Sequence, residues 1–346
     1  MKKRILVTGG TGFIGSHTTV ELQNAGYDVV IIDNLSNSDA NVLDGIEKIT
    51  GIRPAFEQVD CCDLAALEGV FKKYPGISGI IHFAASKAVG ESVEKPLKYY
   101  ENNIMSLVNL LKLMPEYGVK GIIFSSSCTV YGQPDPENLP VTEEAPIKTA
   151  ESPYGNTKQI NEEIIQDYIK SGANISAIIL RYFNPIGAHP TAIIGELPNG
   201  VPANLIPYLP QTAIGIRPCL SVFGDDYDTP DGSCIRDFIY VVDLAKAHVA
   251  AMARIVEGKN ADPVEIFNVG TGNGVSVLQL INTFEKVTGV KLNYKIVARR
   301  AGDIEKVWGN VDKANNVLGW KAVHTLDEAL LSAWKWQQQL RERGIM

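Results

Sequence analysis

The stretch TGGTGFIG at residues 8–15 decides the fold. It follows the apolar run Ile5–Val7 and precedes a segment with helical spacing. Gly9, Gly12 and Gly15 are spaced so that the chain can turn tightly, a phosphate can approach the backbone, and helix can pack closely on strand. Amides at the start of the following helix would then face the anion. The stretch predicts a strand–turn–helix unit that binds a pyrophosphate.

A carboxylate at the end of the next apolar run indicates which dinucleotide binds. Asp33 follows Val29–Ile32 and lies 18 residues beyond Gly15. A carboxylate in that place can bind the hydroxyls of the adenosine ribose and repels a 2′-phosphate, which favours NAD over NADP. A simple strand-end cap is the alternative role for Asp33. Asp60, at the end of the next strand, is expected near the adenine.

Strand and helix patterns alternate through the first half of the chain, which is typical of a parallel sheet covered on both faces. We expect an α/β fold: a Rossmann-like doubly wound parallel sheet with a smaller α/β C-terminal substrate-binding domain. The expected NAD-binding domain spans 1–182, with the chain returning to it near 241–269, and the smaller cap spans 183–346. The strands are expected at Ile5–Val7, Val29–Ile32, 55–59, Gly79–Phe83, Gly121–Phe124 and Ser176–Leu180, and the clearest helices at Ile14–Ala25, Leu64–Tyr74, Leu97–Tyr117, Tyr154–Lys170 and Leu326–Arg341.

Composition excludes several classes of protein. The 346 residues are 45% hydrophobic, which argues against disorder, and 39 acidic against 32 basic side chains give a net charge of −7. Because the basic residues are scattered, we expect no nucleic-acid partner. No apolar run is long enough to cross a membrane, and the N-terminal apolar run is too short for an export signal. The five cysteines form no metal or disulfide pattern, so we expect reduced thiols, a cytoplasmic protein and no metal site.

The segment YGNTK at 154–158 carries a candidate catalytic pair. Tyr154 and Lys158 are four residues apart and therefore share one helical face. A free tyrosine has a pKa of about 10, and a nearby ammonium together with a cationic nicotinamide should favour the phenolate. Ser127 ends the apolar run Gly121–Phe124 and its serine extension, at the edge where a doubly wound sheet presents residues to its ligand. These residues together predict proton transfer beside a nicotinamide.

With these motifs the chain resembles the extended short-chain dehydrogenase/reductase family, whose marks are TGxxGxxG, a strand-end serine or threonine, and YxxxK. Within that family it is similar to the UDP-sugar 4-epimerases along essentially its whole length. The resemblance implies interconversion of UDP-galactose and UDP-glucose through a 4-keto intermediate with tightly bound NAD. The stretches that carry it are Gly9–His17, Asp33–Leu35, Lys87–Ser92, Ser125–Gly132, Ser152–Lys158, Arg181–Pro190 and Arg299–Asp303.

The resemblance also implies roles for individual residues. Tyr154 would be the base, Lys158 would bind the nicotinamide ribose and tune Tyr154, and Ser127 would aid proton transfer. The expected cofactor-binding residues are Gly9, Gly12, Phe13, Ile14, Gly15, Asp33, Asn34, Asp60, Cys61, Lys87, Asn102, Tyr154, Lys158 and Tyr182. The expected substrate-binding residues are Ser127, Thr129, Asn184, Asn204, Phe223, Arg236, Arg300, Asp303 and Val307.

Among the substrate residues, Val307 is expected near the C2 substituent of the sugar. In the resembling family a bulky aromatic there restricts the pocket, and valine is much smaller. The sequence therefore leaves UDP-N-acetylglucosamine and UDP-N-acetylgalactosamine open as further substrates.

Three other functions remain possible from the sequence. A 4,6-dehydratase is disfavoured because no acidic residue follows Ser127. A uronate epimerase is not excluded, and neither is a non-catalytic NAD or UDP-sugar sensor, although a sensor has no need to retain the Tyr154–Lys158 pair. The family resemblance further implies a homodimer formed through the helices expected at Leu97–Tyr117 and Tyr154–Lys170.

Overall fold

A seven-stranded parallel sheet forms the centre of the molecule, with strand order β11-β6-β5-β4-β1-β2-β3. The computed structural model describes residues 2–198, 200, 202, 205–300 and 303–345. The order runs outward from β1 in both directions, so a crevice opens between β1 and β4 at the carboxyl ends of the strands. The strands are β1 (Arg4–Thr8), β2 (Asp28–Asp33), β3 (Ala55–Gln58), β4 (Ile77–His82), β5 (Gly121–Ser127), β6 (Ser176–Tyr182) and β11 (Val264–Val269).

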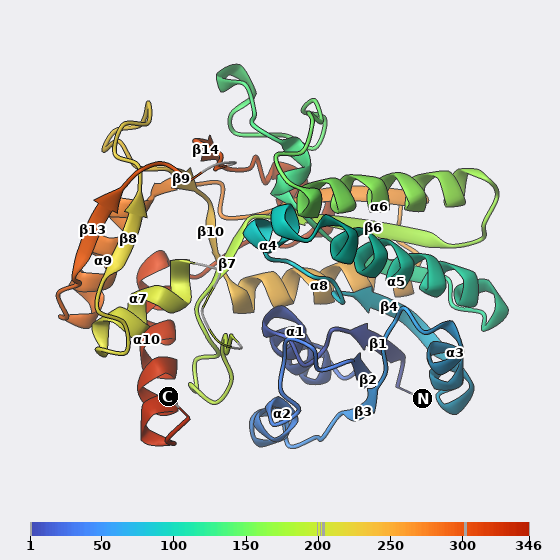
Figure 1. The fold of residues 1–346 in the computed structure, drawn as a ribbon. Coiled ribbons are helices and arrows are strands. Elements are labelled where there is room, and N and C mark those ends of the chain that lie inside the picture. Colours follow the sequence, from blue (N-terminus) through green and yellow to red (C-terminus); the bar gives the residue numbers. More distant parts are fainter. Residues whose placement is uncertain (1, 199, 201, 203–204, 301–302, 346) are drawn as a thin grey trace.

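Helices cover both faces of this sheet (Figure 1). One face packs against α1 (Phe13–Asn24), α2 (Val42–Thr50) and α8 (Val241–Val256). The other packs against α3 (Leu64–Lys73), α5 (Pro96–Glu116) and α6 (Pro153–Lys170), while the short α4 (Val89–Glu94) contacts α5 and α6. Successive residues of a strand point to opposite faces of the sheet, and consecutive residues of these strands are apolar. Both faces of the sheet are therefore apolar. The predicted doubly wound parallel sheet is confirmed.

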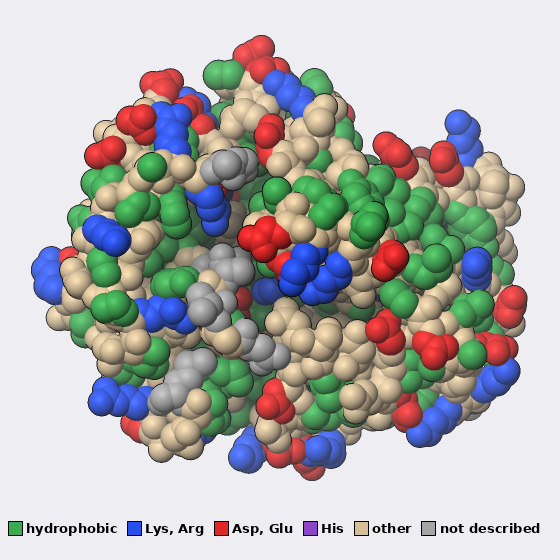
Figure 2. Space-filling view, viewed as in Figure 1, with side chains coloured by type: hydrophobic (Ala, Val, Ile, Leu, Met, Phe, Trp, Pro, Cys, Tyr) green, Lys and Arg blue, Asp and Glu red, His purple; other side chains and the backbone are tan. Residues whose placement is uncertain are grey.

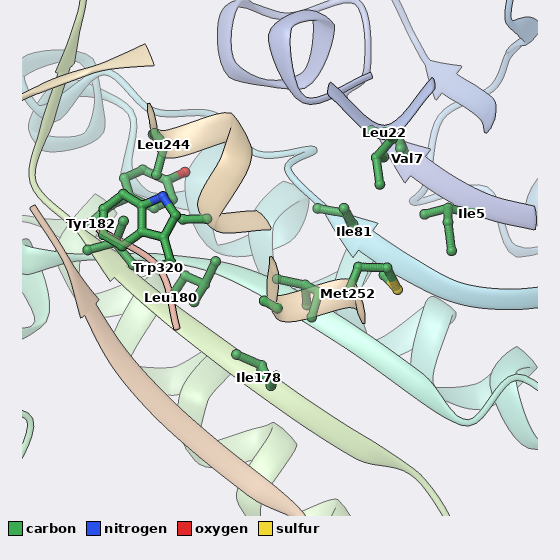
Figure 3. Packing of buried hydrophobic residues seen from close by; sticks show 14 of the residues in the cluster. Ile5, Val7, Leu22, Ile81, Ile178, Leu180, Tyr182, Leu244, Met252 and Trp320 are labelled. Atoms are coloured by element: carbon green, nitrogen blue, oxygen red, sulfur yellow. The ribbon is translucent and has the colours of Figure 1, made fainter. Parts of the chain in front are cut away.

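Two of these elements come from far along the chain. Strand β11 pairs in parallel with β6, and α8 contacts α1 and strands β4 to β6. Figure 3 shows Met252 of α8 between Ile81 and Ile178 of the sheet, and Leu244 of the same helix near Tyr182 and Trp320. Helix α8 packs closely against β4: a Cβ added to Gly79 would lie only 2.6 Å from the Met252 sulfur.

The rest of the chain forms a smaller lobe with its own core, seen at the left of Figure 1. Its short strands form three small sheets, and no helix among the described residues is long and apolar enough to cross a membrane. The elements are β7 (Asn184–Ile186), α7 (Leu205–Ala213), β8 (Leu220–Phe223), β9 (Ile235–Arg236), β10 (Phe238–Tyr240), β12 (Val275–Ser276), α9 (Val277–Thr288), β13 (Tyr294–Val297), β14 (Lys306–Val307) and α10 (Leu326–Glu342). Among the short helical turns, η1 (Cys128–Tyr131) and η2 (Pro136–Asn138) follow β5, and η1 packs on α6 and β6, while η3 (Ala314–Leu318) packs on α8 and β11.

Candidate active site

The glycine turn has the shape of an anion cradle. Gly9 has φ +67°, a backbone conformation that other residues rarely adopt. A Cβ on Gly15 would lie 2.3 Å from the carbonyl oxygen of Gly9, so only glycine fits between turn and helix. Gly12 is the N-cap of α1, and no side chain caps that helix or places an acid in its first turn. Phe13 and Ile14 begin the helix, so their amides belong to the same cradle, which fits a pyrophosphate.

Asp33 is held rigidly at the carboxyl end of β2. Its Oδ1 accepts hydrogen bonds from the Leu35 amide at 2.9 Å and the Ser38 hydroxyl at 3.0 Å, and its Oδ2 accepts one from the Thr11 amide at 3.3 Å. Thr11 lies in the glycine turn, so the carboxylate is fixed beside the anion cradle. This arrangement suits the ribose of a dinucleotide whose pyrophosphate occupies the turn.

Four other predicted cofactor-binding residues lie near Asp33. The Asn34 side-chain amide donates to Asp60 Oδ2 at 3.0 Å, and the Cys62 amide donates to Asp60 Oδ1 at 2.8 Å. Cys61 is buried, and Asn102 of α5 accepts through its backbone oxygen from the Cys62 thiol at 3.5 Å. The ends of β2 and β3 and one turn of α5 therefore meet in one place.

The predicted Tyr154–Lys158 pair lies at the start of α6. Ser152 caps this helix by accepting from the Gly155 amide at 3.2 Å, which places Tyr154 in the first turn. The Lys158 side chain is buried; its Nζ donates to the Ser125 carbonyl at 2.6 Å and lies 5.9 Å from the centre of the Tyr154 ring. Burial lowers the pKa of Lys158 to about 8, against the opposing charge of Glu162. The ammonium is therefore directed between the end of β5 and the tyrosine ring.

Tyr154 and Ser127 face one another across the end of β5. Removal from water raises the pKa of Tyr154 above its usual value, and the Ser127 hydroxyl acts in the opposite direction. The sequence predicts a lowered pKa for Tyr154. That lowering therefore depends on positive charge close to the ring, from the Lys158 ammonium and a cationic nicotinamide. Ser127 also accepts from the Thr129 amide at 3.2 Å, while the buried Thr129 hydroxyl has no hydrogen-bond partner in the described structure. That hydroxyl is therefore a buried polar group close to Ser127 whose hydrogen bonding is unsatisfied.

Tyr182 closes this side of the cluster. It lies opposite Ser127 in the β5–β6 register, and its hydroxyl shares a short hydrogen bond with the Ser125 hydroxyl. Burial raises the pKa of Tyr182 to about 12, so this phenol stays neutral. Tyr182 can therefore shape the pocket as an uncharged group.

Lys87 lies on the loop that follows β4. Its side chain is exposed and forms an ion pair with Glu196 of the loop after β7, at 3.3 Å. Asn103, which the sequence did not single out, anchors the same loop: its side chain accepts from the Ser86 amide at 2.8 Å and donates to the Ser86 carbonyl at 3.0 Å. The Lys87 loop is thus fastened to both α5 and the smaller lobe.

Four of the nine predicted substrate residues meet in one part of the smaller lobe. Asp303 Oδ1 accepts from Arg236 at 3.0 Å and from Arg300 at 3.1 Å, and the Arg300 guanidinium lies 5.5 Å from the centre of the exposed Phe223 ring. The predicted Asn204 lies outside the described residues. A cavity of about 970 Å³ adjoins Asp303, the one predicted substrate residue in its lining, and is otherwise bounded mainly by Gln133–Pro136, Ile147–Thr149 and Glu305 with Lys306. Figure 2 shows the surface hollowed between the two lobes, with charged side chains at the rim.

The remaining two predicted substrate residues line the junction between the lobes. Asn184 is the first residue of β7 and donates through its amide to the Asp237 carbonyl at 2.9 Å. Val307 is 1% exposed and pairs with Arg236 on the next strand, inside an apolar cluster with Cys128 and Phe183. Since Cys128 follows Ser127, this cluster adjoins the end of β5.

Two buried charged residues next to the site, Glu162 and Arg181, were not predicted from the sequence. Glu162 of α6 and Arg181 of β6 form a buried ion pair at 2.6 Å. The four-residue step from Lys158 to Glu162 is a signal that could have been read, since both must lie on one helical face. Nothing in the sequence pairs Glu162 with Arg181, because that contact depends on the order of the strands.

Comparison with known proteins agrees with the geometry. Residues 5–270 match the profile of the "NAD dependent epimerase/dehydratase family". The chain belongs to this family. Its similar relatives include UDP-glucose 4-epimerases of Dictyostelium discoideum, 49% identical over 96% of this chain and 95% of the relative, and of Homo sapiens, 47% identical over 98% and 97%. The crystal structure of UDP-glucose 4-epimerase from Bifidobacterium longum in complex with NAD⁺ and UDP superposes with a TM-score of 0.93, at 46% identity, covering 97% of this chain and 98% of that one.

Proposed function

We propose that this protein is a UDP-glucose 4-epimerase that interconverts UDP-galactose and UDP-glucose with tightly bound NAD. The observation that carries the proposal is the meeting of Tyr154, Lys158 and Ser127 at the carboxyl end of β5, on the same edge of the sheet as the glycine turn that follows β1. The close relatives with that name support the substrate. The dehydratase, uronate epimerase and sensor alternatives have no comparable support.

The cofactor cradle defines what the chain's residues do for NAD. Gly9, Gly12 and Gly15 let the backbone approach the pyrophosphate, and Asp33 binds the adenosine ribose and disfavours a 2′-phosphate. Lys158 binds the nicotinamide ribose. Bound NAD would supply reversible hydride acceptance at C4 of the sugar. Asn34, Asp60, Cys61, Lys87, Asn102 and Tyr182 complete the proposed cofactor contacts, with Phe13 and Ile14 in the cradle.

Proton movement belongs to the residues of the β5–α6 junction. Tyr154 takes the proton of the sugar 4-hydroxyl, and Ser127 shares that proton through its own hydroxyl. The Lys158 ammonium stabilises the phenolate that Tyr154 needs to act as a base. The resulting 4-keto sugar turns its other face to the same groups, and Tyr154 returns the proton to the opposite epimer.

The smaller lobe is proposed to hold the nucleotide. Arg236 and Arg300 bind the diphosphate, Phe223 packs on uracil, and Asp303 binds the uridine ribose. Both arginines donate through Nη2 to one oxygen of Asp303, which leaves other N–H groups of each guanidinium for the diphosphate. Asn184, Asn204 and Thr129 are proposed to contact the diphosphate or the hexose only lightly, because the ketone must be free to turn.

A wider substrate range follows from Val307. A small side chain at this position leaves room for a 2-acetamido group, and we propose that the N-acetylated sugar pair is also converted. A relative of known structure, the UDP-Glc/GlcNAc 4-epimerase from Campylobacter jejuni, is 35% identical to this chain. That relative supports acceptance of N-acetylated sugars within this fold.

Assembly and location are part of the proposal. An apolar hollow of about 150 Å³, lined by Val108, Ile164 and Tyr168, lies between α5 and α6, and Leu97 at the start of α5 is 73% exposed. These features suit a homodimer formed through α5 and α6. The free cysteines suit a reducing cytoplasm. We also propose residues 1–182 with 241–269 as the NAD-binding domain and the rest of 183–346 as the cap.

The test uses the protein as purified, without added NAD. Conversion of UDP-galactose to UDP-glucose in a coupled assay, together with NAD released on denaturation, is the expected result. Incubation with a reducing sugar should also raise the absorbance of the reduced nicotinamide. Protein that contains NAD but converts no UDP-hexose would overturn the proposal in favour of a sensor.

A further inference from the structure

A buried ion pair lies directly behind the candidate catalytic cluster. The side chains of Glu162 and Arg181 are 2% and 3% exposed. Arg181 Nη2 donates to Glu162 Oε2 at 2.6 Å, and Nε donates to Oε1 at 3.0 Å. Such a pair loses its hydration on folding, so apolar side chains in the same volume are often at least as stable. Its place next to the site therefore calls for a reason other than stability.

Glu162 ties the helix to the catalytic end of β5. It lies one helical turn beyond Lys158, on the same face of α6. Its Oε1 accepts a short hydrogen bond from the Ser126 hydroxyl. Ser126 lies between Ser125, whose carbonyl accepts from Lys158, and Ser127, the proposed proton relay. Two successive turns of α6 thus hold two successive residues of the strand.

Arg181 fixes the carboxylate in turn. It lies opposite Ser126 in the β5–β6 register. Its Nη1 donates to the Tyr131 hydroxyl at 3.1 Å and to the Glu143 carbonyl at 3.2 Å, and its guanidinium lies over the Tyr131 ring. Tyr131 ends the helical turn that begins directly after Ser127. The pair therefore grips the chain on both sides of that serine.

The charge of Glu162 also acts on Lys158. Around Lys158 lie Tyr154 and Glu162 from α6, the Phe124 ring and the Ser125 carbonyl from β5, and His82 from β4. Burial and the Lys158 charge lower the pKa of His82 to about 3, so that ring is neutral.

Among the described residues, Glu162 is the charged group that raises the pKa of Lys158 against its burial. The Arg181 guanidinium is paired with Glu162. The carboxylate is thus placed to keep the lysine protonated.

We propose that Glu162 is a positioning residue for catalysis: clamped by Arg181, it holds Ser126 and Ser127 against α6 and keeps Lys158 as the ammonium that Tyr154 requires. This inference rests on the proposed function. Arg181 acts only through Glu162. Neither residue touches the reacting atoms.

The first test is the pH profile of turnover on UDP-galactose for Glu162→Gln, which keeps the volume and removes the charge. Loss of the carboxylate makes the Lys158 ammonium easier to deprotonate. The high-pH limb of kcat should therefore move toward lower pH by about one unit, with kcat at the optimum reduced about tenfold or more. An unchanged pH profile in a folded variant would refute the electrostatic role.

A second variant separates catalysis from stability. The double change Glu162→Leu with Arg181→Met replaces the pair by apolar side chains and leaves no charge unpaired. It should recover thermal stability relative to Glu162→Gln, yet keep the shifted pH limb and the low kcat. Turnover and pH profile equal to the unmodified protein would overturn the proposal.

The matched control is the Arg254–Glu265 ion pair, which joins α8 to the start of β11 at 2.6 Å. Glu265→Gln should lower the melting temperature but leave the pH profile unchanged; a shift equal to that of Glu162→Gln would show that any buried charge loss has this effect. The unmodified protein is assayed in parallel. If it contains NAD but turns over no UDP-galactose, the proposed function fails independently of Glu162.

Discussion

Replacing Tyr154 by phenylalanine should remove most of the turnover and leave the fold intact. The phenyl ring keeps its place in the first turn of α6, and only the hydroxyl near Ser127 disappears. Loss of one hydrogen bond of this kind costs about 1 kcal/mol of stability or less. Loss of a positioned general base costs roughly a hundredfold to ten-thousandfold in rate, or about 3–5 kcal/mol in the barrier. The effect on kcat should therefore far exceed the effect on unfolding.

Three measurements check this prediction: kcat for UDP-galactose, NAD released on denaturation, and the midpoint of thermal unfolding. NAD content and the midpoint should stay close to those of the unmodified protein. Tyr168→Phe is the control. It removes the same hydroxyl group from the same helix, but Tyr168 is 14 residues after Tyr154 on α6. Turnover of Tyr154→Phe within threefold of the unmodified protein would refute the assignment of Tyr154 as the base.

Four further predictions concern the cofactor, the pocket and pH. Asp33→Ser removes a charged acceptor and should weaken NAD about tenfold or more while improving NADP relative to it; equal NAD affinity by titration calorimetry would reduce Asp33 to a strand cap. Gly15→Ala places a Cβ 2.3 Å from the Gly9 oxygen and should purify with little NAD, whereas Gly69→Ala, with open space around it, should keep its NAD. Val307→Tyr should lose the N-acetylated substrates by about tenfold or more in kcat/KM, since overpacking costs about 1–3 kcal/mol, and equal loss on both sugar pairs would contradict a gate at C2. Turnover should decline as the pH rises through about 8, where Lys158 loses its proton, and a plateau through pH 9.5 would contradict the need for the ammonium.

The parts of the site that follow from local spacing could be predicted from the sequence. The glycine turn and Asp33 are set by one strand–turn–helix unit, and the Tyr154–Lys158 pair by one helical turn. Helix α5 begins and ends within one residue of the predicted Leu97–Tyr117. The family resemblance, rather than spacing, brought Arg236, Arg300 and Asp303 into consideration together.

Contacts that depend on the order of strands in the sheet could not be predicted from the sequence. Glu162 meets Arg181 because β6 lies beside β5, and no residue pattern encodes that neighbour. The ion pair of Asp303 with Arg236 also depends on tertiary packing, since β9 and the segment before β14 are far apart in the chain, whereas Arg300 is only three residues from Asp303. The short strands of the smaller lobe carry too few residues to show a clear alternation.

The return of α8 and β11 to the central sheet has a consequence for biosynthesis. As the chain leaves the ribosome, β1 to β6 emerge well before α8 and β11. On the sheet face that α8 later covers, Gly79 and Gly121 leave the space that Met252 and Ile255 fill. The nascent nucleotide-binding half therefore waits with an uncovered apolar face, which is a surface that chaperones bind and that aggregates. A message truncated between codons 182 and 269 would release a chain that holds every proposed cofactor contact and yet has no complete sheet in which to place them.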